Sequence, residues 1–232
     1  MENIKKVDRF ITVMLLLVCM ALIIFKIRER FLIWNLFLAW IPMKCAIYFY
    51  RLHYRNDKKF EVVSVLNFLV WLFFFPNAFY VVTDFIHISR YKFYYANPNY
   101  GVFPNEPSLI YSFDGKIWAV FFLISLSAFI ACVMGSFSLY LIQEVIKEKF
   151  SKLVSWFIVV FISGLCGYAL YIGRFIRFNS WDVVTQPSIL IKFFFENLDR
   201  QAFLYSFSFA LFSMFIYLCF YIFIYVGKNI SR

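Results

Sequence analysis

Two short stretches of the sequence combine residue types that can do acid–base, metal or anion chemistry. In residues 73–87 an apolar run is interrupted by Pro76-Asn77 and ends in an aspartate and a histidine. In residues 174–182 two arginines, an aspartate and several polar side chains follow another apolar run. Because ionisable groups at the mouth of an apolar membrane segment are costly, each stretch is a functional-site hypothesis.

The first stretch contains a candidate acid–base pair. If the chain stays helical beyond Thr83, Asp84 and His87 are three residues apart and lie on one helical face. The carboxylate can then accept a hydrogen bond from the imidazole or share a metal ion with it. If the protein is an enzyme, His87 would be the acid or base of a hydrolase or transferase. The candidate catalytic residues are Asp84, His87 and Asp182.

The second stretch contains a candidate anion site. Arg174 and Arg177 have the same spacing of three and would present two guanidinium forks to one anion, which suits a phosphate group. Ser180 is either a nucleophile near His87 or a helix cap before Trp181. The candidate ligand-binding residues are Asn77, Tyr80, Thr83, Arg174, Arg177, Asn179, Ser180 and Trp181.

The same side chains permit a metal ion or a purely structural network. One imidazole and two carboxylates, from His87, Asp84 and Asp182, favour a hard ion such as magnesium, manganese or calcium over zinc. No cofactor-binding motif is evident in the sequence. The two aspartates also balance the charges of Arg174 and Arg177, so the cluster could simply close the end of a helix bundle.

The elements that must position these residues are membrane spans. With 63% hydrophobic residues, 16% charged residues and a mean hydropathy of +0.76, the chain is predicted to be an integral membrane protein. Its six apolar runs approach the roughly 20 residues that cross about 30 Å of hydrocarbon as a helix. We therefore expect an all-α, polytopic fold and a single domain over residues 1–232. The expected spans are residues 10–25, 31–50, 62–82, 117–142, 153–173 and 203–226.

Several features between and inside the spans carry further expectations. Residues 89–116 are predicted to form a lid or a segment lying on the membrane, and an interfacial helix is expected to begin at Pro187 before the last span. The patch Gly135-Ser136-x-Ser138 and the glycines Gly164 and Gly167 predict close helix packing. Lys44 is expected to snorkel or to face the bundle. The five cysteines, all in apolar runs, are interpreted as packing residues.

The direction of the spans predicts where the two stretches meet. Spans three and five run in the same direction, so the segments that follow them emerge on one face, and His53 emerges on the other. Twelve Lys and Arg residues lie on the face of the termini and ten on the face of the two stretches. This bias favours cytoplasmic termini in the cell membrane and an extracytoplasmic site. The basic residues form short runs rather than one stripe, which favours lipid contacts and not nucleic acid.

The chain also resembles the bacterial membrane-protein family of domain of unknown function 1361. The resemblance covers about residues 30–225 and has no activity to carry over; it supports the architecture and the choice of site residues. It rests on three motifs: Phe75-Pro76-Asn77-Ala78-x-Tyr80-x-x-Thr83-Asp84-x-x-His87, Gly135-x-x-Ser138-Leu139, and Gly173-Arg174-x-x-Arg177-x-Asn179-Ser180-Trp181-Asp182.

Three functions are compatible with the sequence. The leading hypothesis is a site that binds an anionic, phosphate-bearing lipid or small ligand, with or without turnover. The second is a substrate-capture or transport subunit of a larger complex, whose protein partners the sequence does not name. The third is a structural or assembly protein in which the polar cluster is only a stability network.

Overall fold

Six helical segments of the computed structural model are long and apolar enough to cross a membrane, which confirms the expected all-α polytopic fold. The structure describes residues 2–26, 28–55, 61–102, 105–176, 185, 188, 192 and 199–230. The elements are α1 (Glu2–Ile24), α2 (Phe31–Arg55), α3 (Glu61–Phe74), α4 (Pro76–Tyr80), η2 (Val81–Arg90), β1 (Tyr94–Ala96), β2 (Leu109–Tyr111), α5 (Gly115–Lys149), α6 (Lys152–Tyr171), η3 (Ile172–Ile176) and α9 (Arg200–Ile230).

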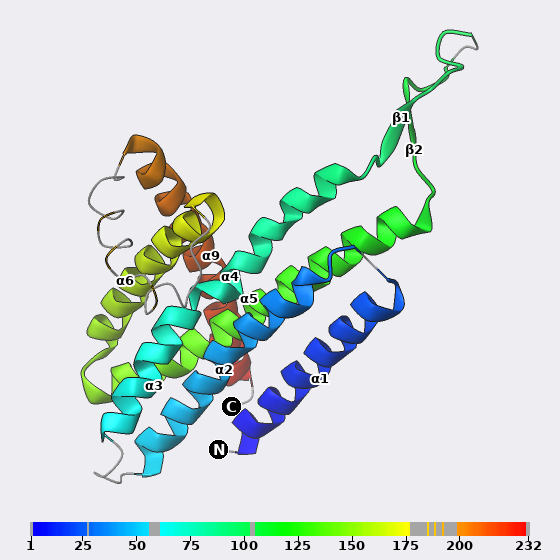
Figure 1. Cartoon of the computed structure of the whole chain (residues 1–232). Helices are drawn as coiled ribbons and strands as arrows, with labels where there is room; N and C mark the ends of the chain where they lie inside the picture. Colours follow the sequence, from blue (N-terminus) through cyan, green and yellow to red (C-terminus); the bar gives the residue numbers. More distant parts are fainter. Residues whose placement is uncertain are drawn as a thin grey trace.

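The spans alternate in direction, and both termini lie at one end of the bundle (Figure 1). We call this the terminal end. The opposite end, which contains the end of η2, the β1–β2 hairpin and η3, is the motif end. The helix expected from Pro187 falls mostly within residues 177–198, of which the structure describes only 185, 188 and 192.

The third span is built from three consecutive helical pieces. Pro76 has no N–H to donate, so the α-helical ladder is interrupted there and α4 starts anew. The Asn77 side-chain amide donates to the Phe74 carbonyl oxygen at 3.0 Å, which satisfies an acceptor next to the break. The chain then continues as a 3₁₀ helix to Arg90, beyond the expected end of the span at residue 82.

Helix α5 runs through the centre of the bundle and has the largest buried face (Figure 1). A Cβ at Gly135 would lie 2.8 Å from the Cβ of Ala78, so this glycine lets α4 approach α5 closely. The indole N–H of Trp71 donates to Ser138 Oγ at 3.2 Å across the same interface. The small-residue patch therefore packs helices as expected.

The two glycines of α6 differ in their surroundings. A Cβ at Gly167 would lie 2.2 Å from the Ser206 carbonyl oxygen of α9, which makes glycine necessary at this crossing. A Cβ at Gly164 would meet nothing within 4 Å. The packing expectation is thus confirmed for Gly167 and wrong for Gly164, which faces away from the neighbouring helices.

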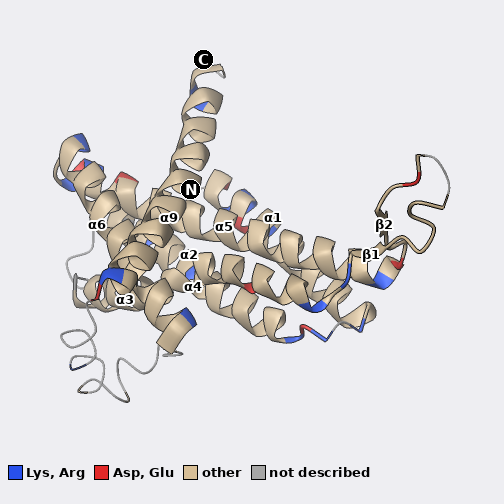
Figure 2. Ribbon diagram, turned by 90° about the horizontal axis from the view of Figure 1, so that it is seen from above, with Lys and Arg blue, Asp and Glu red and all other residues tan. Residues whose placement is uncertain are grey.

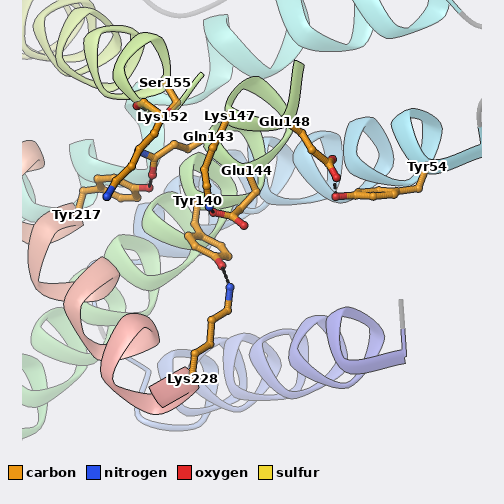
Figure 3. A network of polar contacts seen from close by, with 10 residues as sticks. All are labelled: Tyr54, Tyr140, Gln143, Glu144, Lys147, Glu148, Lys152, Ser155, Tyr217 and Lys228. Atoms are coloured by element: carbon orange, nitrogen blue, oxygen red, sulfur yellow. Dashed lines mark hydrogen bonds and ion pairs between the residues drawn. The ribbon is translucent and has the colours of Figure 1, made fainter. Parts of the chain in front are cut away.

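Polar contacts tie the helices together at the terminal end (Figure 3). Glu148 of α5 accepts hydrogen bonds from Tyr54 Oη at 2.7 Å and contacts His53 Nε2 at 3.1 Å, both in α2. The Lys228 ammonium of α9 donates to Tyr140 Oη of α5 at 2.6 Å. His53 therefore lies at the end opposite Asp84, as the span directions predicted.

The Lys44 side chain of α2 faces the neighbouring helix α1. Its ammonium pairs with the Asp8 carboxylate of α1 and lies 3.3 Å from Thr12 Oγ1. The five cysteines are free and buried or half-buried, in agreement with a packing role.

The loop between the third and fourth spans contains a β-hairpin. Tyr94 pairs with Tyr111 and Ala96 with Leu109 in antiparallel register. The hairpin projects beyond the helices of the motif end (Figure 1). This small sheet is an addition to the helical fold expected from the sequence.

Candidate functional site

The site is organised around Asp84, a carboxylate almost fully buried at the motif end. It lies in η2, where a 3₁₀ helix has three residues per turn and therefore aligns positions i and i+3. His87 accordingly lies on the same face, with Nε2 3.8 Å from Asp84 Oδ1. The two residues therefore lie on one face as expected, in a 3₁₀ helix, but their 3.8 Å separation is longer than a hydrogen bond, so the expected hydrogen bond between them is not seen.

Two other spans supply the partners of this carboxylate. The Asn35 side-chain amide of α2 donates to Asp84 Oδ2 at 2.7 Å. Nη1 of Arg174, in η3 at the end of the fifth span, lies 3.6 Å from Asp84 Oδ1. Arg174, the first residue of the second stretch, thus meets the first stretch at one end of the bundle, as the span directions predicted.

The Asp84 carboxylate is buried more deeply than the two side chains beside it. The Asp84 side chain is 2% exposed, whereas the side chains of Arg174 and His87 are each 19% exposed. The Phe31 ring packs edge-on against the His87 imidazole, with centroids 4.7 Å apart. The carboxylate is therefore positioned to hold the two side chains, and these two keep access to a ligand.

A second buried carboxylate lies beside this cluster. Glu29, in the turn before α2, is 0% exposed, and both of its oxygens accept from the Tyr91 hydroxyl at 3.0 Å. The start of α2 two residues later also favours a negative charge there. Burial and the contact with Glu29 raise the pKa of Tyr91 above its ordinary value, so the hydroxyl remains a donor to a higher pH than an ordinary tyrosine does.

Asn35, Glu29 and Tyr91 were not identified from the sequence. Asn35 is a polar residue inside an apolar span, and this feature could have indicated a buried polar contact. The sequence contains no pattern that identifies Asp84 as its partner. Glu29 stands between two arginines in a short turn, where a solvated side chain is the ordinary expectation.

Two predicted ligand-binding residues are engaged with the local backbone. Asn77 bonds to the Phe74 carbonyl, as described above, and Thr83 Oγ1 donates to the Tyr80 carbonyl at 2.7 Å. The ring of Tyr80 is partly buried against the core. The remaining predicted residues, Arg177, Asn179, Ser180, Trp181 and Asp182, lie outside the described residues.

Positive charge accumulates around the site. The positive charges of Arg90 and Arg174 act on His87, opposed by the negative charge of Glu29. The positive charges of Arg28 and Arg90 act on Tyr91. Figure 2 shows basic residues at the turn between α1 and α2 and at the base of the hairpin. Within the described part of the chain, no three His, Cys, Asp or Glu side chains are grouped to hold a metal ion. The metal site, which included Asp182, stays a prediction.

Comparison with known proteins identifies the family. No curated protein and no solved structure matches the chain. A family model described as "Protein of unknown function (DUF1361)" matches residues 34–218, a segment that contains Asn35, Asp84, His87 and Arg174 and leaves out Glu29. The match covers most of the 232 residues and agrees with the resemblance carried by the sequence motifs. The chain therefore belongs to the DUF1361 family.

Proposed function

We propose that the motif end binds an anionic, phosphate-bearing group, either a lipid headgroup or a small phosphorylated ligand. The observation that carries the proposal is the pairing of a part-exposed guanidinium, Arg174, with a buried carboxylate, Asp84. The buried carboxylate attracts Nη1 of the guanidinium, and the remaining N–H groups of the planar fork can still donate to phosphate oxygens.

The neighbouring charges support this proposal. Arg90 and Arg28 add positive potential close to His87 and Tyr91. By its spacing, Arg177 would supply a second fork, and Asn179, Ser180 and Trp181 would add contacts on the same segment. An anion would therefore enter a rim where basic side chains surround a fixed guanidinium.

His87 is the residue that would carry out acid–base chemistry on a bound ligand. Its imidazole is part-exposed and lies beside Asp84, a carboxylate that can orient it. If a phosphorylated ligand is turned over, His87 is the group that would accept or donate the proton, in a hydrolase or transferase reaction.

A structural role for the cluster is the second candidate, and the burial of Asp84 favours it. Asp84 joins α2, η2 and η3 through Asn35, His87 and Arg174, so it links three spans at the motif end. A network of this kind is costly to break even when no ligand binds. The two candidates differ in what Arg174 does: only the first requires its fork to contact a ligand.

We further propose that the termini are cytoplasmic in the cell membrane and that the motif end is extracytoplasmic. The excess of Lys and Arg on the terminal side supports this orientation. Impermeant maleimide labelling of intact cells at Ser89→Cys and, as the matched position at the other end, Lys149→Cys tests it. Labelling of position 149 from outside would reverse the assignment.

The binding proposal is tested with Arg174→Lys and Arg174→Gln in the full-length protein. Native mass spectrometry with phosphatidic acid reports a lipid headgroup, and calorimetry with inorganic phosphate reports a free anion. We expect the Lys variant to bind several-fold more weakly and the Gln variant about tenfold or more, because charge-assisted hydrogen bonds are lost.

The control is Lys6→Gln, which removes an exposed cation at the terminal end. It should leave binding unchanged. If all three variants retain phosphatidic acid and phosphate like the parent, or if the parent retains neither, the anion role is wrong and the structural reading stands.

A further inference from the structure

The β1–β2 hairpin is stiffened by its own polar contacts. Asn97, which is 9% exposed, donates from its side-chain amide to Glu106 Oε2 at 3.0 Å and to the Pro107 carbonyl at 2.8 Å. Its side-chain oxygen accepts from the Asn99 N–H at 2.9 Å. At the base, the Trp118 indole donates to the Ser112 carbonyl at 2.8 Å. Polar contacts therefore hold the hairpin both beyond the strands and at the base, although two strands alone are only marginally stable in water.

The two faces of the hairpin follow from its register. Directly paired residues share a face, so Tyr94, Tyr111, Ala96 and Leu109 lie on one face, which we call the tyrosine face. Tyr95 and its partner Ile110 lie on the other. Tyr94 is 58% exposed and Tyr111 is 68% exposed, which leaves the tyrosine face unpartnered within the described chain.

Charge distinguishes the hairpin from its base. Residues 93–113 contain one acidic residue, Glu106, and no Lys or Arg. The base contains three exposed basic residues, Arg90, Lys92 and Lys116, and one exposed acidic residue, Asp114, so its net charge is positive. A tyrosine-rich face above a base of net positive charge is complementary to the membrane–water interface, where anionic headgroups attract basic residues and aromatic rings sit at headgroup depth.

We propose that the tyrosine face of the hairpin docks on an anionic lipid surface beside the motif end. The base of the hairpin adjoins the ends of two candidate membrane spans. Their exposed apolar side chains include Ile86 of η2 and Phe122 of α5. The proposal does not depend on ligand binding by Arg174.

Adjacent positions of β2 test the proposal directly, because Ile110 and Tyr111 point to opposite faces. Each is replaced by cysteine in a full-length parent in which Cys19, Cys45 and Cys219 are changed to alanine, which leaves only the two buried cysteines. An NBD fluorophore is attached, and the protein is placed in nanodiscs of phosphatidylcholine with one quarter phosphatidylglycerol. Quenching by a lipid spin label near the headgroup is compared with quenching by aqueous iodide.

We expect the spin label to quench the probe at position 111 at least twofold more than at position 110, and iodide to show the reverse order. Lys92→Gln with Lys116→Gln should reduce the lipid quenching at position 111, and so should nanodiscs of phosphatidylcholine alone. Equal quenching at the two positions, or access to iodide alone, would overturn the proposal and indicate that the hairpin faces water or a soluble partner.

Discussion

Arg174 Nη1 lies 3.6 Å from Asp84 Oδ1, so the ends of the fifth and third spans meet at one buried carboxylate. Since Asp84 also accepts from Asn35, its removal affects three spans at once. The pair is therefore a positioning device, whether or not an anion binds at Arg174.

The first prediction concerns the charge of Asp84. Asp84→Asn should lower the free energy of unfolding by about 1–3 kcal/mol, because the part-buried Arg174 loses its counter-charge. Thermal unfolding in a mild detergent measures the loss. Glu2→Gln, which breaks an exposed pair with Lys6, is the control and should change stability by no more than about 0.5 kcal/mol. Equal melting temperatures for the two variants would show that Asp84 is not a structural anchor.

The second prediction concerns the contact between Tyr91 and Glu29. Tyr91→Phe leaves a fully buried carboxylate without its donor and should cost about 1–3 kcal/mol of stability at pH 8. The contribution also depends on pH with a defined sign. Because the pKa of Tyr91 is raised in the folded state, its contribution is complete below the ordinary tyrosine pKa and is lost as pH rises through the folded pKa.

The measurement for Tyr91 is a comparison of melting temperatures between parent and variant from pH 8 to pH 11. The difference should shrink toward the alkaline end as the parent's hydroxyl ionises. Tyr95→Phe is a matched control, since it removes a hydroxyl from the exposed hairpin and should have little effect at any pH. A difference that grows with pH would contradict the assigned role.

The helical fold could be predicted from the sequence because each span carries its own signal. Apolar runs of sufficient length predict the spans. Because consecutive spans alternate in direction, the sequence also predicts that the ends of spans three and five, with Asp84 and Arg174, lie at the same end of the bundle. The i, i+3 spacing of Asp84 and His87 was also readable. The features that could be predicted are therefore those that depend on the length of an apolar run, the direction of a span or the spacing of residues within one helix.

The remaining features depend on contacts between distant residues. Neither Asn35 nor Glu29 has a sequence pattern that names its partner, because each is matched only when helices pack. The three-residue strands of the hairpin are too short to show alternation, and the 3₁₀ helix after Tyr80 follows the break at Pro76 rather than any composition signal. Gly164 and Gly167 look alike in sequence, and only the position of α9 distinguishes them.

The third prediction uses these two glycines. Gly167→Ala places a Cβ against the α9 backbone and should destabilise the bundle by about 1–3 kcal/mol through overpacking. Gly164→Ala meets nothing within 4 Å and should be neutral or stabilising by up to about 1 kcal/mol, because alanine favours the helix. Both are measured by thermal unfolding in detergent. A Gly164→Ala variant as unstable as Gly167→Ala would mean that α6 packs differently in the bundle.

The fourth prediction concerns the ion pair between α1 and α2. Lys44 and Asp8 are both part-exposed, and Thr12 accepts from the same ammonium. Asp8→Asn leaves a cation, and Lys44→Met leaves an anion, in a segment surrounded by lipid, so each single variant should lose stability. The double variant removes both charges and should be more stable than the sum of the single losses predicts, with a coupling of about 1–2 kcal/mol. Melting temperatures of the four proteins complete the cycle. Strictly additive losses would show that the two side chains do not act as a pair.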